Sequence, residues 1–319
     1  MCTAISFFAD DYYFGRNLDY EYDFGQKVVI TPRNFLFNFK NGEILDCHYA
    51  IIGMALVEEN YPLYFDATNE CGLSIAGLNF PGNAVYYEPK SGKTNIASFE
   101  LIPYLLSKCK NVSEVKDLVV DINITNMAFS KDLQPSPLHW LVSYKGESLT
   151  IEQTLQGLKV FDNPFGVLTN NPTFDYHITN LSNYMSVTSN EAQNMFSDKI
   201  NLKAYSRGMG GIGMPGDLSS ASRFVRATFT KLNSPKLQEK HEALNHFFHI
   251  LYSVYQTKGC AKVGNKYEIT NYTSCCSTQK GIYYYTTYNN FTINSVSMHK
   301  QDLNTNSLYS FALVQNHEI

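Results

Sequence analysis

The feature that most constrains this chain is the cysteine at its second position, directly behind Met1. Methionine aminopeptidases remove an initiator methionine when the next side chain is small, as that of cysteine is. Cys2 would then carry both a thiol and a free α-amine. A thiol is mostly protonated at neutral pH, whereas an α-amine titrates near ~7.7–8.0 and can accept the thiol proton. The sequence therefore allows a nucleophile at the chain start that brings its own base.

The residues that follow Cys2 predict a β-hairpin. Small or polar residues alternate with larger ones up to Phe8, residues 9–11 are typical of a turn, and a second β-rich run follows. Closing the hairpin over this turn pairs Ala4 with Arg16. Because directly opposed residues share a sheet face, Arg16 is expected on the same face as Cys2.

The same register pairs Cys2 with Leu18 and places Asp19 just beyond the chain start, where its carboxylate could hold the α-ammonium. A slip of one residue would move Arg16 to the opposite face. On Cys2 alone, an ordinary hairpin with a buried cysteine is the commoner arrangement, because free cysteines usually behave as small hydrophobic residues.

Composition favours β structure and excludes some function classes. Hydrophobic residues make up 44% of the 319 residues, with 23 tyrosines and 21 phenylalanines against one tryptophan. The net charge of −4 provides no basic field for nucleic acid. Seven cysteines without CxxC spacing fit a reducing cytoplasm. The longest apolar run, residues 50–57, is too short to span a bilayer, and no signal peptide precedes Cys2, so we expect a soluble cytoplasmic protein.

Along the chain, blocks of strands are separated by blocks of helices, which predicts antiparallel sheets covered by helices. Strands are expected at 2–8, 27–31, 35–39, 49–57, 61–68, 72–79, 138–144, 148–154, 158–161, 266–275, 280–288, 290–298 and 308–314, together with the β-rich run that begins at 12–14. Helices are expected at 97–108, at 113–120 and over much of 177–257, notably 217–232 and 237–256. No linker or repeat interrupts this pattern, so residues 1–319 are expected to form one domain.

Two asparagines stand at strand ends, where a rigid scaffold can present polar groups to a cleft. Asn79 closes an apolar strand, and Asn170 follows another and precedes Asn171-Pro172. A side-chain amide is a neutral donor suited to a developing oxyanion. Turn formation is the simpler reading of these residues taken alone.

Rival chemistries lack support in the sequence. His241 and His246 resemble a zinc-protease motif, but they are five residues apart and do not share a helix face. No GxSxG elbow occurs, and Gly92-Lys93-Thr94 lacks the first glycine of a phosphate-binding loop.

The chain resembles the choloylglycine hydrolase family, the N-terminal-nucleophile amidases that include conjugated bile salt hydrolases and penicillin V acylases. The motifs that carry the resemblance are Met1-Cys2-Thr3-Ala4-Ile5, Phe14-Gly15-Arg16-Asn17-Leu18-Asp19, Tyr61-Pro62-Leu63-Tyr64-Phe65-Asp66, Ala76-Gly77-Leu78-Asn79-Phe80, Leu168-Thr169-Asn170-Asn171-Pro172, Gly216-Asp217-Leu218-Ser219-Ser220-Ala221-Ser222-Arg223-Phe224 and Gly281-Ile282-Tyr283-Tyr284-Tyr285. They are spread over essentially the whole chain.

The resemblance implies an α+β fold, a four-layer αββα sandwich, with Met1 removed on maturation. It implies catalytic roles for Cys2, Arg16, Asp19, Asn79, Asn170 and Arg223, with Asn171 as the alternative if the register is off by one. Asn79 and Asn170 would serve the oxyanion and orient the substrate. The two arginines would lie near Cys2, where positive charge favours a thiolate. The family needs no metal or organic cofactor.

The resemblance also implies a substrate and an assembly. Asn79 follows the bile salt hydrolase pattern, where penicillin V acylases commonly have tyrosine, so glycine- and taurine-conjugated bile acids are the expected substrates. Segments near 20–26, 58–65 and 127–137 would line an apolar pocket. Arg207, within Tyr205-Ser206-Arg207-Gly208, is of a loop type that similar enzymes associate with glycine conjugates, and the family often forms homotetramers. Penicillin V acylase activity and a non-catalytic bile-acid-binding protein remain the alternatives.

Overall fold

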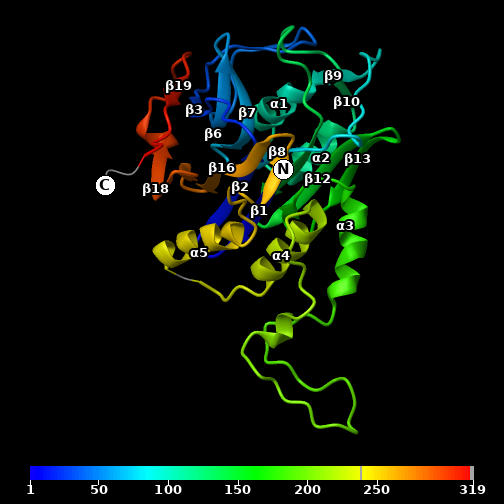
Figure 1. The fold of residues 1–319 in the computed structure, drawn as a ribbon. Helices are drawn as coiled ribbons and strands as arrows, with labels where there is room; N and C mark the ends of the chain where they lie inside the picture. The colour runs from blue at the N-terminus through cyan, green and yellow to red at the C-terminus, as the bar shows by residue number, and fades with distance from the viewer. Residues whose placement is uncertain (238, 317–319) are drawn as a thin grey trace.

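Two antiparallel β-sheets stack face to face, and helices cover their outer faces (Figure 1). The structure is a computed structural model that describes residues 1–237 and 239–316. Helices α4 and α5 contact the first sheet through β1, β2 and β16, whereas α1 and α2 contact the second sheet through β6, β7, β8, β11 and β12. The predicted αββα sandwich is confirmed.

The first sheet has the order β14-β1-β2-β16-β17-β18, with β15 paired to β16. Its strands are β1 (Cys2–Phe8), β2 (Tyr12–Tyr20), β14 (Val167–Leu168), β15 (Ala261–Val263), β16 (Lys266–Ser277), β17 (Ile282–Thr287) and β18 (Asn290–Ser297). The chain start therefore lies inside this sheet, with β2 on one side of β1 and β14 on the other.

The second sheet has the order β13-β12-β11-β8-β7-β6-β3-β19. Its strands are β3 (Lys27–Thr31), β6 (Ile51–Glu58), β7 (Tyr61–Asn69), β8 (Ser74–Asn79), β11 (Leu138–Tyr144), β12 (Glu147–Thr154), β13 (Gly157–Asp162) and β19 (Tyr309–Phe311). Two small ribbons pair β4 (Phe37–Asn38) with β5 (Ile44–Leu45), and β9 (Thr94–Ala97) with β10 (Ile122–Thr125).

The helices are α1 (Leu101–Lys108), α2 (Val112–Val119), α3 (Phe174–Leu181), α4 (Ser220–Leu232) and α5 (Lys240–Tyr252). Single 3-10 turns occur at Ser98–Glu100, Ser182–Tyr184, Met209–Gly211 and Met298–Lys300. Asn111 caps α2 by accepting a hydrogen bond from the backbone N–H of Glu114 at 2.9 Å, and Ser219 caps α4 through the N–H of Ser222.

The continuous apolar run of β6 follows from its position between two covered faces. Ile52 and Met54 enter the cluster between the sheets, whereas Ile51 and Ala55 enter the cluster beneath α1 and α2. All four are fully buried. Alternation along one strand thus serves two cores at once.

The register predicted for the N-terminal hairpin is confirmed. Cys2 pairs with Leu18 and Ala4 with Arg16. The next strand passes so close to Gly15 that a Cβ atom there would lie 2.0 Å from the carbonyl oxygen of Ser274, so only glycine fits. This close approach fixes β2, and with it Arg16, against β16.

The prediction of helix over much of 177–257 is wrong for its middle part. Residues 185–216, which we call the arm, extend away from the sandwich between α3 and α4, with one 3-10 turn and no α-helix (Figure 1). Its large apolar side chains face solvent instead of packing as a helix stripe: Met185, Met195, Phe196, Ile200, Leu202, Tyr205 and Ile212. The prediction from the sequence also omitted β9 and β10, which are short and pair with each other in parallel, whereas the strand expected before Asn170 is present as β14.

Within residues 1–237 and 239–316, no helix is long and apolar enough to cross a membrane. The seven cysteines are all free thiols in this part of the chain.

Candidate active site

Cys2 is the first residue of β1 and is 2% exposed. Its register with Leu18 places its side chain in the space between the two sheets, on the same face as Arg16. Both side chains line one end of a cavity of about 290 Å³. The thiol thus lies where a pocket meets the buried start of a strand.

This cavity, which we call the Cys2 pocket, is mainly apolar and aromatic. Its lining comprises Cys2, Arg16, Leu18, Tyr20, Tyr22, Phe24, Leu56, Leu63, Tyr64, Phe65, Gly77, Asn79, Ser98, Phe99, Phe129, Asp132, Leu133, Gln134, Ser136 and Leu138. All three segments expected to line a pocket, near 20–26, 58–65 and 127–137, contribute to it. A rigid hydrophobic molecule fits such walls better than a strongly polar one.

Arg16 ties the first sheet to the second. Its Nη1 donates to the carbonyl oxygens of Phe65, at 3.1 Å, and Gly77. Burial opposes its charge, but neighbouring acidic groups, Cys2 foremost and Asp66 among them, raise the pKa of Arg16. Its Nη2 is buried and meets no hydrogen-bond partner among the described residues. Arg16 therefore supplies a fixed positive charge beside the pocket with one donor group unused.

Asn170, two residues beyond the end of β14, joins three distant segments. Its Oδ1 accepts from the backbone N–H of Cys2 at 2.7 Å and from Nη2 of Arg223 at 2.8 Å. Its Nδ2 donates to the carbonyl oxygen of Asn79 at 2.6 Å. Ser220 holds its backbone N–H at 2.7 Å. Asn170 therefore fixes the chain start against β8 and α4.

Arg223 approaches the chain start from the opposite face of the first sheet. It projects from α4, and its Nη1 donates to the carbonyl oxygen of Cys2 and, at 2.7 Å, to Oγ1 of Thr3. Its Nη1 lies 4.0 Å from the Asp19 carboxylate. Burial lowers the pKa of Arg223, while Asp19 acts in the other direction. The two predicted arginines thus lie on either side of the Cys2 strand.

Asp19 is fully buried, and its carboxylate is held by the hydroxyl of Thr270 at 2.7 Å and by Nε2 of Gln256 at 3.4 Å. Burial raises its pKa, and Arg223 counteracts this. The ammonium group of Met1 donates to the backbone carbonyl of Asp19 at 2.6 Å rather than to its carboxylate. The ammonium instead forms an ion pair with Glu268. Glu268 is a neighbour of the chain start that sequence reasoning missed.

A second group of residues holds Asn170 from behind. His177 contacts the backbone oxygen of Asn170 through Nε2 at 2.9 Å, and His139 contacts that of Thr169 at 2.8 Å. The other nitrogen of His139 lies 3.0 Å from Glu152. Burial, the largest cause, lowers the pKa of His177 to about 4, so its ring is neutral at pH 7. Two buried histidines therefore position the backbone that presents Asn170.

The structure brings six predicted residues together: Cys2, Arg16, Asp19, Asn79, Asn170 and Arg223. Asn79 lines the Cys2 pocket at the end of β8. Asn171 instead donates to the carbonyl oxygen of Pro81 at the surface, at 2.6 Å. Arg207 is exposed on the arm and does not line the pocket.

Among the further residues near Cys2, Asp66 could have been found from the sequence, whereas Glu268 and His177 could not. Asp66, inside a quoted motif, accepts hydrogen bonds from the hydroxyls of Tyr272 at 2.7 Å and Tyr283 at 2.6 Å, and lies near Arg16. Glu268 and His177 stand in ordinary strand and helix patterns, so only the fold reveals their positions. In the described part of the chain, no group of three or more His, Cys, Asp or Glu could hold a metal ion.

Comparison with known proteins agrees with this geometry. Residues 2–311 match the model of the linear amide C–N hydrolases of the choloylglycine hydrolase family. The chain belongs to the choloylglycine hydrolase family. The resemblance stated from the sequence is thereby confirmed, and the chain is a member of a family of enzymes that cleave linear amides.

Among members of the choloylglycine hydrolase family, the bile salt hydrolase/transferase of Lactiplantibacillus plantarum is 54% identical over 98% of this chain and 97% of its own length. That of Clostridium perfringens is 39% identical over 98% and 96%. A mutant conjugated bile acid hydrolase from Clostridium perfringens superposes with a TM-score of 0.93 at 38% identity, covering 100% of this chain and 99% of that one. Penicillin V acylase from Agrobacterium tumefaciens shares the fold, with a TM-score of 0.79 at 18% identity, covering 99% and 94%.

Proposed function

We propose that this chain is a cysteine amidase that hydrolyses the C–N bond of glycine- or taurine-conjugated bile acids. The observation that carries the proposal is the placement of Cys2, at the start of a buried strand, where an apolar pocket opens beside Arg16 and Asn79. Full-length relatives at 54% and 39% identity bear the name bile salt hydrolase/transferase. The pocket of about 290 Å³ is near the lower end of ordinary ligand sites.

The proposed reaction begins once Met1 has been removed. The α-amine of Cys2 takes the thiol proton, and the thiolate attacks the amide carbonyl carbon. The amide nitrogen leaves with the proton delivered by the α-ammonium, so glycine or taurine departs and a thioester remains on Cys2. Water then attacks the thioester, passing its proton through the same amine, and releases the free bile acid. No metal or organic cofactor enters this scheme.

The hydrogen bonds of the site divide the roles of its residues. The Nδ2 group of Asn170 already donates to the backbone of Asn79, whereas no hydrogen bond of the Asn79 side chain is found in the described residues. Asn79 is therefore the better oxyanion donor, and Asn170 positions the chain start. Arg223 and Asp19 are positioning residues on the far face of β1, and Arg16 supplies positive charge on the near face.

The direct test compares wild type with Cys2→Ala and Cys2→Ser on a glycine-conjugated bile acid. Because sulfur is the attacking atom, Cys2→Ala should release no glycine above the uncatalysed rate, and Cys2→Ser should lose at least about 10²-fold in kcat. Free glycine and free bile acid are measured together and should appear in equal amounts. Wild-type turnover by Cys2→Ala would overturn the proposal.

Penicillin V acylase activity on the same machinery is the second candidate. It is favoured by the shared fold alone, because the solved acylase is 18% identical. Asn79 at the pocket favours the bile salt reaction. Release of glycine or taurine is compared with release of phenoxyacetate under matched conditions, and dominant phenoxyacetate release would reverse our choice.

A non-catalytic bile-acid-binding protein is the alternative of another class. The ammonium of Met1 contacts Glu268 and the backbone carbonyl of Asp19. While Met1 remains, the nitrogen of Cys2 is a peptide N–H and cannot act as a base. Intact-mass measurement of the purified protein decides this point, because uniform retention of Met1 would favour the binding protein.

We further propose that the chain works as one domain in the bacterial cytoplasm, as a homotetramer. The arm exposes Met185, Met195 and Phe196 to 82–89%, which is unusual for large apolar side chains on an isolated protein. A second copy of the chain is a suitable partner for this surface. Docking of the arm could also bring Arg207 to a neighbouring Cys2 pocket, where its charge would pair with the carboxylate of a glycine conjugate.

A further inference from the structure

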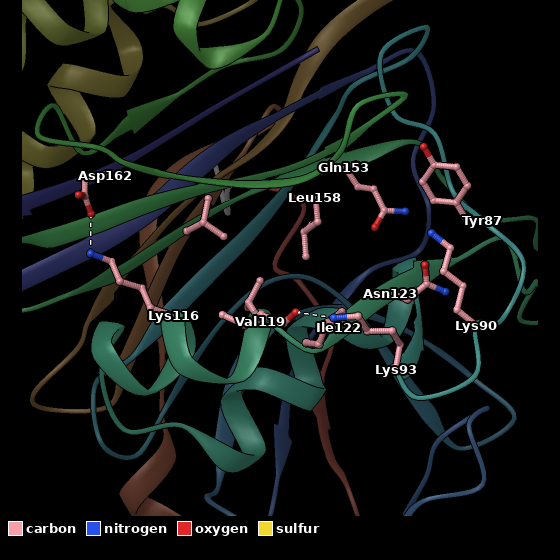
Figure 2. A pocket seen from close by; sticks show the side chains of 13 residues that line it. Tyr87, Lys90, Lys93, Lys116, Val119, Ile122, Asn123, Gln153, Leu158 and Asp162 are labelled. Carbon is pink, nitrogen blue, oxygen red and sulfur yellow. Dashed lines mark hydrogen bonds and ion pairs between the residues drawn. The ribbon is translucent and has the colours of Figure 1, made fainter.

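A second cavity lies on the outer side of the second sheet and shares no lining residue with the Cys2 pocket. It has a volume of about 640 Å³ and runs between the end of α2, the β9–β10 ribbon and the edge strand β13 (Figure 2). We call it the α2–β13 groove. Such a volume is ample for a small organic ligand.

The floor of the groove is apolar. Val119 and Ile122 are buried at its base, and Leu158 and Val160 face it from β13. Leu158, Val160 and Asp162 lie on one face of β13 because strand side chains alternate. At the rim, Val120 is 72% and Val160 39% exposed. The groove therefore leaves apolar surface open to solvent.

Three lysines surround this floor, Lys90 and Lys93 from the loop before β9 and Lys116 from α2, in a chain whose net charge is −4. Lys116 is paired with Asp162 at one end, with Nζ 2.6 Å from Oδ1 (Figure 2). Lys93 donates to the carbonyl oxygen of Val120 at 3.0 Å and lies 3.7 Å from an exposed carboxylate. Lys90, at the other end, lies 4.2 Å above the Tyr87 ring and meets no carboxylate among the described residues. The end near Lys90 and Lys93 is thus the place for an anionic head group.

From this pairing of an apolar floor with a cationic end, we propose that the α2–β13 groove is a second binding site for an amphipathic carboxylate, namely an unconjugated bile acid. The steroid body lies on Val120, Leu158 and Val160, and the carboxylate lies between Lys90 and Lys93. The choice of a steroid as occupant rests on the proposed function, because hydrolysis would release such molecules. The groove itself is distinct from the catalytic pocket.

The test is equilibrium dialysis of the full-length protein against labelled cholate, kept below its micelle concentration. Wild type should bind two molecules per chain, one in each site. The variant Lys90→Glu/Lys93→Glu should bind one, with the groove affinity reduced at least about tenfold. Lys27→Glu/Lys300→Glu changes the same charge at two exposed lysines outside the groove and should bind two. Thermal unfolding of all three proteins checks that the fold is retained.

Two further measurements make the result decisive. Raising salt from 0.1 to 1 M shortens the screening length from ~10 to ~3 Å and should weaken the groove site. Saturated amidase rates of the groove variant should equal wild type, so loss of the groove and loss of the proposed reaction are separable. One molecule bound to wild type, two bound to the groove variant, or filling of the groove by dodecanoate but not by cholate would each overturn the proposal.

Discussion

The chain start and the arm differ in how they are held: the chain start is buried and hydrogen-bonded to distant segments, whereas the arm is exposed to solvent. Around Cys2, Asn170 and Arg223, backbone and side-chain groups are linked by hydrogen bonds of 2.6–2.8 Å between segments more than 50 residues apart. In the arm, large apolar side chains face solvent, and the backbone N–H of Thr188 reaches across to the carbonyl oxygen of Gly210 at 2.9 Å. A change at the chain start should therefore alter chemistry, whereas a change in the arm should alter association.

The largest effect is expected from extending the chain start. Inserting one lysine between Met1 and Cys2 would prevent removal of Met1 and leave the nitrogen of Cys2 in a peptide bond. The site would lose its base, which is worth ~10²–10⁴ in rate, and the added residues would crowd Glu268, so kcat should fall by at least ~10³. The measurement is glycine release from a glycine-conjugated bile acid.

The matched control for this extension is a removable tag whose protease leaves Cys2 as the first residue. Cleavage should restore the wild-type rate, because it regenerates the free amine without changing the fold. Full activity of the uncleaved, extended protein would show that the base lies elsewhere, and the contrast between the two regions would lose its chemical meaning.

Asn79 and Asn171 offer a matched pair of substitutions. Asn79→Ala removes the side-chain donor at the pocket, and kcat should fall ~10²–10³-fold with little change in KM. Asn171→Ala removes a surface hydrogen bond to Pro81 and should stay within about tenfold of wild type. Steady-state kinetics on one conjugated bile acid compare them. A larger loss of kcat for Asn171→Ala than for Asn79→Ala would show that Asn79 is not the oxyanion donor.

His177, which is buried behind Asn170, predicts a pH-dependent stability. The pKa of His177 is lowered to about 4 by burial, against ~6.5 in the unfolded chain. The unfolded state therefore binds more protons between these values, and stability falls as the pH drops through this window. Between pH 7.5 and pH 5, this linkage should lower the free energy of unfolding of wild type by about 2 kcal/mol. The His177→Gln variant should not show this loss. Stability is measured by denaturant titration at each pH, and curves of stability against pH that run parallel for wild type and His177→Gln would contradict this prediction. The arm contains no histidine and therefore makes no such contribution.

The same contrast explains what the sequence could and could not predict. The hairpin of Cys2 and Arg16 was predictable from alternation of period two and a short turn, and the observed pairing is the expected register rather than the slip of one residue that the sequence left open. Asn170 was found through its motif and strand-end position. Its contacts were not predictable, because they join residues 2, 79 and 223 by tertiary packing.

The helix prediction for the arm was wrong for the opposite reason. Residues such as Glu191, Ala192 and Gln193 favour a helix, but helix propensity is weak without an apolar face to bury. In the described chain the arm has no core to pack on, so its apolar residues remain exposed. Local sequence patterns thus predicted the structure correctly where the apolar side chains are buried, as in the N-terminal hairpin. They predicted it wrongly where the apolar side chains are exposed, as in the arm.

The smallest catalytic effect is expected in the arm itself. Met195→Ser/Phe196→Ser removes two large apolar side chains that are more than 80% exposed, so the folded chain should lose little stability. If the arm docks on a second copy, this variant should elute as a smaller species in light scattering, while kcat per chain stays within about twofold. Arg207→Ala tests the neighbouring-pocket role and should raise KM for a glycine conjugate a few-fold more than for a taurine conjugate. An unchanged assembly with a large fall in kcat would mean that the arm serves the chemistry directly, and the two regions would then be parts of one site.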